Sequence, residues 1–285
     1  MPPHVLTLSC ADRIGIVAAV SGHLAAIDGF ILDSQQYADL EAGRFFLRVA
    51  FHGAGPAFPT ATETLRAGFA PIAERFGFDW SIDPADARMR IVIAVSKGSH
   101  CLNDLLHRWK SGDLPVDIVA VVSNHDHLRA LTEWHGVPYH HLPIVDGDRA
   151  AQEAALLAVV QDSGADLLVL ARYMQVLGPA LAHALSGRCI NIHHSFLPSF
   201  KGARPYARAH DRGVKLIGAT AHYVTHDLDE GPIIEQAVER VDHRATEADL
   251  IRIGRDIEAQ VLARAVRWVA ERRVFLNGHR TVVFG

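Results

Sequence analysis

Residues 191–202, which read NIHHSFLPSFKG, combine side-chain types that could polarise a carbonyl group. If a strand ends here, Asn191 and His193 point to the same side of it and Ile192 points away. An asparagine amide donates a hydrogen bond without adding charge, and a histidine supplies a donor that titrates near neutral pH. Together they could stabilise the oxyanion that forms when a nucleophile attacks a carbonyl group. The alternative is a strand end capped by polar side chains, but the long irregular loop that follows favours a functional site.

A second candidate segment places three carboxylates, those of Asp227, Asp229 and Glu230, before Gly231. We expect this segment to be a loop between two extended runs. A carboxylate close to His193 would favour the imidazolium and could orient a water molecule. An acidic turn without a catalytic role is the alternative.

The elements that would position these side chains alternate between strand and helix. Strands are expected at 90–95, 116–122, 137–141, 166–170 and 189–192, with helices at 102–109, 127–134, 150–161 and 177–185. An extended pair at 215–224 and 233–241 and a long helix at 247–272 follow. This alternation predicts βαβ units and a mostly parallel, Rossmann-like α/β sheet. Ligands of such sheets bind beyond the carboxyl ends of the strands, where residues 191–202 begin.

The first part of the chain predicts a separate domain. Strands at 5–9, 30–40, 44–51 and 78–82 and helices at 16–27 and 60–76 give the ferredoxin-like order βαββαβ. Asp12 is expected to cap the first helix, and Gly29 to end it with a positive φ. Residues 83–87 are polar, contain a proline and form the best linker candidate. We therefore expect domains at 1–83 and 84–285, the first without catalytic residues.

Other candidate sites have weaker support. The loop at 96–100 has one glycine, unlike the phosphate-binding motifs GxGxxG and Walker A. Histidine is abundant, at 18 residues, but neither the pair His125 and His127 nor the pair His140 and His141 has the spacing of a known metal motif. We therefore expect no bound metal.

Composition excludes several classes of protein. A net charge of −4 argues against a general nucleic-acid binder, and no apolar run is long enough to span a membrane. The N-terminal residues do not resemble a secretion signal. Three widely spaced cysteines fit reduced thiols, so a cytoplasmic protein is expected.

Residues 191–202 and the run from Asp229 to Ile234 resemble the two signatures of the folate-dependent formyl-transfer family. The resemblance, over about residues 88–245, implies a catalytic triad of Asn191, His193 and Asp229. It further implies that the substrate's pterin ring is bound by two segments. The substrate-binding residues would be Tyr173, Met174, Gln175, Val176, Leu177, His222, Val224 and Thr225.

Two features favour a resemblance to the hydrolytic branch of this family over the ribonucleotide-formylating branch. The segment from Ser96 to Leu106 departs from the Gly-Ser-Asn loop with which the ribonucleotide-formylating branch grips phosphate, and the first domain resembles an ACT domain. Such domains imply an amino-acid effector, glycine or methionine, near Asp12, Gly15 and Gly29, and a homo-oligomer. The effector's identity stays open, because Phe30 replaces the usual Asn after Gly29.

The resemblance implies hydrolysis of 10-formyltetrahydrofolate to tetrahydrofolate and formate, which supplies formate for purine synthesis and balances one-carbon pools. No metal or other cofactor is expected, because an imidazolium supplies the electrophile. Two alternatives stay open at this point. One is a formyl transferase that uses an amine acceptor, and the other is a non-catalytic sensor of folate or amino acids.

Overall fold

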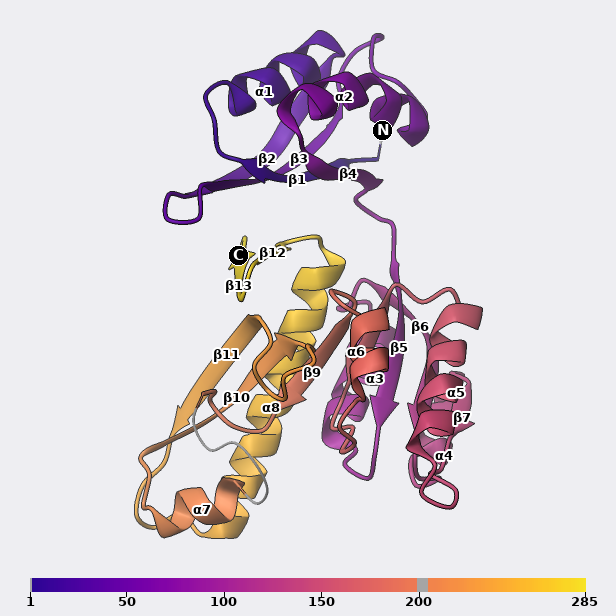
Figure 1. The fold of residues 1–285 in the computed structure, drawn as a ribbon, viewed down its shortest axis with the longest axis vertical. Helices are drawn as coiled ribbons and strands as arrows, with labels where there is room; N and C mark the ends of the chain where they lie inside the picture. The colour runs from indigo at the N-terminus through magenta and orange to yellow at the C-terminus, as the bar shows by residue number, and fades with distance from the viewer. Residues whose placement is uncertain (1, 199–204) are drawn as a thin grey trace. The chain divides into compact units, whose positions relative to one another are not determined.

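The computed structural model describes residues 2–198 and 205–285, and its contacts divide the chain into two units (Figure 1). The first unit comprises Met1–Ala87, Glu271–Asn277 and Val282–Gly285. The second comprises Arg88–Ala270 and Gly278–Thr281. None of the described helices is both long enough and apolar enough to span a lipid bilayer.

The first unit has the predicted βαββαβ order. Its elements are β1 (His4–Ala11), α1 (Ile16–Ala26), β2 (Gly29–Asp39), β3 (Arg44–Gly53), α2 (Thr62–Phe76) and β4 (Asp79–Pro84). The strands form an antiparallel sheet in the order β2-β3-β1-β4. Alternate residues of β1, Leu6, Leu8 and Cys10, pack in one core with apolar residues of the two helices, as an amphipathic strand should.

Two local predictions about helix α1 are wrong. Gly15 precedes the helix with a φ of 96°, and no side chain caps this end, so Asp12 is not its cap. At the other end the positive φ belongs to Asp28, at 56°, whereas Gly29 already begins β2. A glycine is still needed at position 29, because a Cβ atom there would lie 2.8 Å from the Leu24 carbonyl oxygen.

The C-terminal segment contains two strands that the sequence pattern did not reveal, β12 (Val274–Asn277) and β13 (Arg280–Val283). Long-range contacts hold residues 271–277, which include β12, in the first unit. Arg48 donates to the Glu271 carbonyl oxygen, and Asn277 donates to Asp39 at 2.7 Å. The division by contacts therefore differs from the expected boundaries of 1–83 and 84–285. The regulatory and catalytic roles expected for those ranges stay predictions.

The second unit contains the predicted mostly parallel sheet. Its elements are β5 (Met89–Val95), α3 (His100–Ser111), β6 (Val116–Ser123), α4 (Arg129–Trp134), β7 (Tyr139–His141), α5 (Arg149–Asp162), β8 (Leu167–Leu170), α6 (Pro179–Ala184), β9 (Cys189–His193), α7 (Pro205–Asp211), β10 (Leu216–Tyr223), β11 (Ile233–Arg240) and α8 (Glu247–Ala270). The strand order is β11-β10-β9-β8-β5-β6-β7, with β10 antiparallel to β9 and to β11. Helix α7 was not predicted.

Both faces of this sheet are buried, as its apolar strands require. On β5, Val92 and Ala94 join a core that includes residues of α5 and α6. Ile91, Ile93 and Val95 are equally buried and alternate with them, so they face the other side of the sheet. Helices α3 and α8 pack against one another, and α8 contacts β9, β10 and β11. These layers fix the carboxyl ends of β8 and β9, where the candidate site begins.

The core of the first unit generates a stability prediction. Phe69 is fully buried, and its ring contacts that of Trp80 at a centroid distance of 5.0 Å. Phe69→Ala should lower the free energy of unfolding of this unit by about 3–5 kcal/mol in urea titrations, because it removes a buried ring and leaves a cavity. The control variant Leu40→Ala changes a side chain of the same unit that is 86% exposed and should cost much less. Equal costs for the two variants would contradict this assignment of the core.

Candidate active site

A cavity of about 490 Å³ opens in the second unit at the carboxyl ends of β8 and β9. All eleven residues that the sequence predicted for catalysis and substrate binding line it. They are Tyr173, Met174, Gln175, Val176, Leu177, Asn191, His193, His222, Val224, Thr225 and Asp229. The last four residues of the first signature, 199–202, lie outside the described residues. The two signatures, which begin 38 positions apart at Asn191 and Asp229, therefore meet at one cavity.

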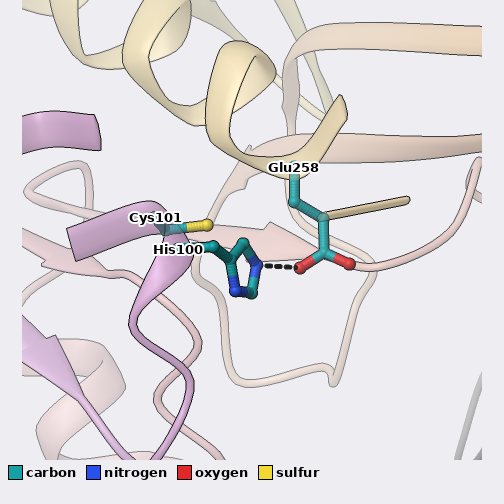
Figure 2. A group of neighbouring side chains, drawn as sticks. All are labelled: His100, Cys101 and Glu258. Carbon is teal, nitrogen blue, oxygen red and sulfur yellow. Dashed lines mark hydrogen bonds and ion pairs between the residues drawn. The ribbon is translucent and has the colours of Figure 1, made fainter. Parts of the chain in front are cut away.

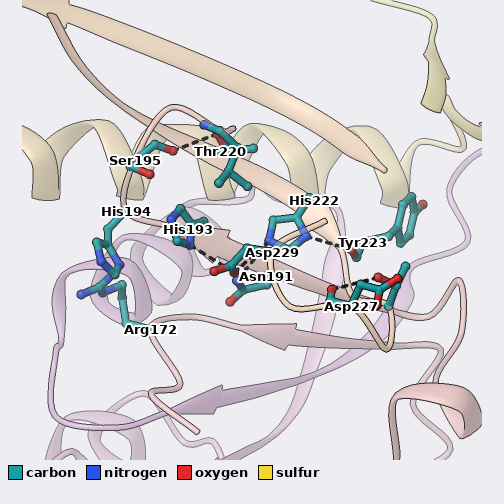
Figure 3. Close-up of polar contacts among 12 residues, drawn as sticks. Arg172, Asn191, His193, His194, Ser195, Thr220, His222, Tyr223, Asp227 and Asp229 are labelled. Carbon is teal, nitrogen blue, oxygen red and sulfur yellow. Dashed lines mark hydrogen bonds and ion pairs between the residues drawn. The ribbon is translucent and has the colours of Figure 1, made fainter. Parts of the chain in front are cut away.

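His193 and Asp229 are paired. His193 Nδ1 lies 3.1 Å from Asp229 Oδ1, so the ring donates to the carboxylate (Figure 3). His193 Nε2 is buried and has no hydrogen-bond partner among the described residues. Burial raises the pKa of Asp229, but the hydrogen bond from His193 and the electrostatic interactions with His193 and His222 outweigh it and hold that pKa below its ordinary value. The carboxylate is therefore ionised at neutral pH, and one ring nitrogen stays available to a ligand.

Asn191 is oriented by His222. Asn191 Nδ2 lies 3.3 Å from His222 Nε2, and His222 Nδ1 lies 2.8 Å from the Tyr223 carbonyl oxygen. Burial lowers the pKa of His222 despite its bond to that carbonyl and the charge of Asp229. A neutral ring that donates through Nδ1 must accept through Nε2. One amide hydrogen of Asn191 therefore points at His222, and the other has no hydrogen-bond partner among the described residues. The sequence had assigned His222 to substrate binding alone.

The loop that carries Asp229 has an unusual backbone. Asp229 adopts a φ of 58°, in the left-handed region that Asp tolerates better than most residues. Two residues later, a Cβ atom at Gly231 would lie 1.7 Å from the Tyr223 carbonyl oxygen. Only glycine allows the loop to approach β10 this closely. The Gly-Pro of the second signature therefore shapes the loop, while Asp229 carries the charge.

The loop that follows His193 is held by a buried threonine. Thr220, fully buried on β10, donates to the Ser195 carbonyl oxygen at 2.9 Å and accepts from Leu197 N at 3.0 Å. Gln236 on β11 donates to both Thr220 Oγ1 and the Leu197 carbonyl oxygen. The residues immediately after His193 are therefore fixed to two neighbouring strands, which restrains the direction of the His193 side chain.

The segment after β8 gives the cavity an apolar wall. Met174 and Val176 are 58% and 53% exposed, and both line the cavity. Tyr173 between β8 and Met174 is buried in the core, and Met174 N donates to Ser96 Oγ at 3.0 Å. The wall therefore presents apolar side chains on an anchored backbone, which suits a flat aromatic ring.

The sequence analysis gave no role to several residues that line this cavity, among them Arg172, His194 and Tyr206. An Arg172 Nη1–H donates to His194 Nδ1, and the His194 ring stacks on that of His193 with centroids 4.9 Å apart. Burial, and then the charge of Arg172, lower the pKa of His194 to about 4. The pattern held two signals for them: a second histidine beside His193, and an arginine at the end of a buried strand.

Comparison with known proteins identifies the family. A sequence profile described as formyl transferase matches residues 89–266. Formyltetrahydrofolate deformylases from Corynebacterium sp. (strain P-1) and Bacillus subtilis (strain 168) are 53% and 49% identical over 98% of this chain and 97% and 93% of theirs. The crystal structure of formyltetrahydrofolate deformylase from Burkholderia mallei superposes with a TM-score of 0.95 at 53% identity, covering all of both chains.

The chain therefore belongs to the formyl transferase family. Within that family it groups, by similarity along nearly its whole length, with the formyltetrahydrofolate deformylases. The predicted family and fold class are confirmed.

The pairing of His193 with Asp229 generates a prediction about rate. Asp229→Asn keeps the shape of the side chain but removes the charge that stabilises the imidazolium. We expect kcat/KM for the formylated folate to fall by roughly 10²- to 10⁴-fold, the range for loss of a general acid–base partner. The matched variant Glu230→Gln neutralises an exposed carboxylate of the same loop that does not line the cavity, and it should retain near-normal turnover. Normal turnover in Asp229→Asn would leave Asp229 as a turn residue only.

The neutral state of His194 generates a prediction about pH. Its folded pKa of about 4 lies below the ordinary value of 6.5, so between these values the unfolded chain binds a proton that the folded chain does not. The free energy of unfolding should therefore fall as the pH drops from 6.5 to 4. His194→Asn removes this contribution, so urea titrations should show a shallower pH dependence for the variant. Identical slopes would contradict the buried, neutral state of this ring.

Proposed function

We propose that this protein hydrolyses 10-formyltetrahydrofolate to tetrahydrofolate and formate. The observation that carries the proposal is the meeting of Asn191, His193 and Asp229 beside a cavity with an apolar wall. Similarity over nearly the whole chain to proteins named formyltetrahydrofolate deformylase supports the same reaction. The volume of about 490 Å³ is within the range of small-molecule sites.

In this proposal Asn191 and His193 bind the formyl oxygen. The free hydrogen of the Asn191 amide and the Nε2–H of protonated His193 are the two donors. Water attacks the formyl carbon, a new C–O bond forms, and the carbonyl electron pair moves to the oxygen, which becomes an oxyanion. The two donors stabilise this charge more strongly than the charge of the starting carbonyl, which is the requirement for catalysis.

Asp229 completes the chemistry. It accepts the Nδ1–H of His193 and so stabilises the imidazolium, and it accepts a hydrogen bond from the attacking water. As the tetrahedral intermediate collapses, the bond between the formyl carbon and N10 breaks. Asp229 takes the proton that the water loses as it attacks and passes it to N10 as N10 leaves. The formic acid that forms then ionises, so formate departs with net release of one proton. The imidazolium supplies the electrophile, so this scheme needs no metal or other cofactor.

The folate ring is proposed to bind between two segments of the chain. Residues 173–177 supply the apolar wall, and Val224 and Thr225, after β10, supply the facing one. His222 touches the cavity but acts mainly on Asn191, since its ring is only 2% exposed.

The first unit is proposed to regulate the second and to pair with a second copy of the chain. Its four-stranded antiparallel sheet ends in the edge strand β2. On this strand Phe30, Leu32 and Tyr37 are 56%, 53% and 47% exposed. A long edge strand with exposed apolar side chains favours pairing. An amino-acid effector, glycine or methionine, would bind near Asp12, Gly15 and Gly29, and the reaction would supply formate for purine synthesis in the cytoplasm.

The decisive experiment measures formate release from 10-formyltetrahydrofolate without an added amine. We expect formate and tetrahydrofolate in equal amounts. Release only when an amine acceptor is present would instead indicate a formyl transferase, and no release at all would favour a non-catalytic folate or amino-acid sensor.

Two variants test the proposed donors in the same assay. Asn191→Ala and His193→Ala should each lower kcat by roughly 10²- to 10³-fold, because each removes one oxyanion donor. Affinity for a folate analogue should change little, since the donors act mainly after attack. The control His127→Ala replaces an exposed histidine that does not line the cavity. Near-normal kcat in correctly folded His193→Ala would refute the proposed role.

A further inference from the structure

A buried carboxylate on helix α8 lies behind the candidate active site. The Glu258 side chain is 1% exposed. Its Oε2 accepts from His100 Nε2 at 2.8 Å and pairs with Arg172 Nε at 3.3 Å, and its Oε1 accepts from Tyr206 Oη at 2.6 Å. Burial raises the pKa of Glu258, but the bond from His100 and the charge of Arg172 outweigh it. An ionised carboxylate therefore occupies the apolar face of α8, although burying a charge opposes folding.

A glycine on the same helix makes room for one of these contacts. Gly254 lies one turn before Glu258, in the interior of a 24-residue helix, where glycine is less stable than alanine. Its φ is not positive, so backbone conformation does not require glycine there. A Cβ atom at this position would lie 2.0 Å from Tyr206 Oη. Space for the phenol that donates to Glu258 is therefore the reason for the glycine.

Arg172 also adopts an unfavourable backbone conformation at this site. It has a φ of 65°, which is costly for an arginine. In that conformation its guanidinium reaches the Glu258 carboxylate with Nε and His194 Nδ1 with Nη1. Three features that each oppose stability therefore occur together here: the buried charge of Glu258, the glycine at position 254 and the positive φ of Arg172. Together they fix the position of the Arg172 guanidinium.

The arrangement ends on the proposed catalytic ring. Because Arg172 donates to His194 Nδ1, the neutral His194 ring carries its proton on Nε2 and cannot turn freely. This fixed ring lies against His193 with an interplanar angle of 17°. Asp229 holds one edge of His193, and His194 covers one face. The contacts with Asp229 and His194 together fix the orientation of the His193 ring and so the position of its Nε2 atom.

We propose that Glu258 is a positioning residue for the reaction, acting through Arg172 and His194 to fix the ring of His193. It is not a catalytic residue, since it lines a neighbouring cavity and not the one that contains His193. The expected fall in kcat rests on the proposed function. The expected loss of a fixed His194 ring does not.

A metal site is the competing interpretation of the same cluster. His100, Cys101 and Glu258 each place a possible ligand atom within 4.8 Å of the others (Figure 2). However, His100, Arg172 and Tyr206 already occupy both oxygens of Glu258. Burial, and then the charge of Glu258, raise the pKa of the Cys101 thiol well above its ordinary value. The Arg172 guanidinium is therefore already the cation that pairs with Glu258, and the Cys101 thiol is protonated. Both features disfavour a metal ion at this cluster.

The second cavity gives the Arg172 guanidinium room to move when the carboxylate is lost. It has a volume of about 350 Å³, and Arg172 and Tyr206 line both it and the larger cavity. Glu258→Gln keeps the side-chain shape but turns an NH₂ group or a neutral oxygen toward the donors of His100 and Arg172. The guanidinium then has space to leave His194, and both rings lose their restraint.

The kinetic test compares Glu258→Gln with the wild-type protein in formate release. We expect kcat to fall by roughly tenfold to a hundredfold, as for a displaced catalytic group, with KM changed by less than about twofold. In the His194→Asn background the same substitution should have little further effect, because the two residues act in one chain of contacts. The control Asp104→Asn breaks an arginine–carboxylate pair on α3 that lines neither cavity and should leave kcat unchanged.

A second readout does not need activity. Nitrogen NMR of the histidine rings should show His194 as a single tautomer, protonated on Nε2, in the wild-type protein. A mixture of tautomers is expected in Glu258→Gln. If the wild-type protein releases no formate but Glu258→Gln still gives a mixture of His194 tautomers, the proposed function is refuted. The structural link from Glu258 through Arg172 to His194 is then supported. Titration of the protein with Zn²⁺ should leave the spectrum of His100 unchanged, and stoichiometric binding that displaces its signal would overturn the proposal in favour of a metal site.

The proposal is overturned if folded Glu258→Gln retains wild-type kcat and a single His194 tautomer, even if its melting temperature falls. If this variant fails to fold, Tyr206→Phe and Gly254→Ala take its place, since the first removes only the hydroxyl group that donates to Glu258 and the second displaces it. Both should lower kcat in the same direction by a smaller factor and broaden the His194 signals. Unchanged kcat and unchanged signals in both would overturn it equally.

Discussion

The hydrogen bond between His193 Nδ1 and Asp229 Oδ1, 3.1 Å long, constrains the elements that carry its two ends. His193 ends β9, and Asp229 lies in the loop between β10 and β11, so the antiparallel pairing of β10 with β9 brings them together. That pairing places Thr220 opposite His193 and His222 opposite Asn191. Each proposed oxyanion donor therefore lies opposite a β10 residue. Thr220, opposite His193, fixes the loop that follows His193, and His222, opposite Asn191, orients the Asn191 amide.

The same constraint explains the glycine and the strained backbone of the Asp229 loop. The carboxylate must return from β10 to the end of β9, which requires a tight approach to the Tyr223 carbonyl oxygen and a positive φ at Asp229. Such strain persists only where the surrounding structure over-determines it. In this loop the strained backbone places the ionised Asp229 carboxylate beside His193 Nδ1. The other ring nitrogen, Nε2, has no hydrogen-bond partner among the described residues.

The site also shows how three neighbouring histidines can take different roles. His194 and His222 are both kept neutral by burial, and each uses its lone pair to accept from a named donor, Arg172 or Asn191. His193 lies between them with a carboxylate on Nδ1. The three rings are of one residue type, and their different roles come from their hydrogen-bond partners.

The order of the elements, apart from α7, β12 and β13, and the candidates Asn191 and His193 followed from the residue pattern, and the resemblance to the formyl-transfer family singled out Asp229. Strand and helix periodicity is local, and the loop segments that carry the signatures contain few alternatives of the right type. What the sequence left open was long-range. Which of three carboxylates faces His193, how His222 orients Asn191, and why residues 271–277 pack with the first unit depended on strand pairing and tertiary contacts. Glu258 and His100 are 158 positions apart, so no local pattern could pair them. Local periodicity reports which face of an element is buried, and only the tertiary structure decides what it is buried against.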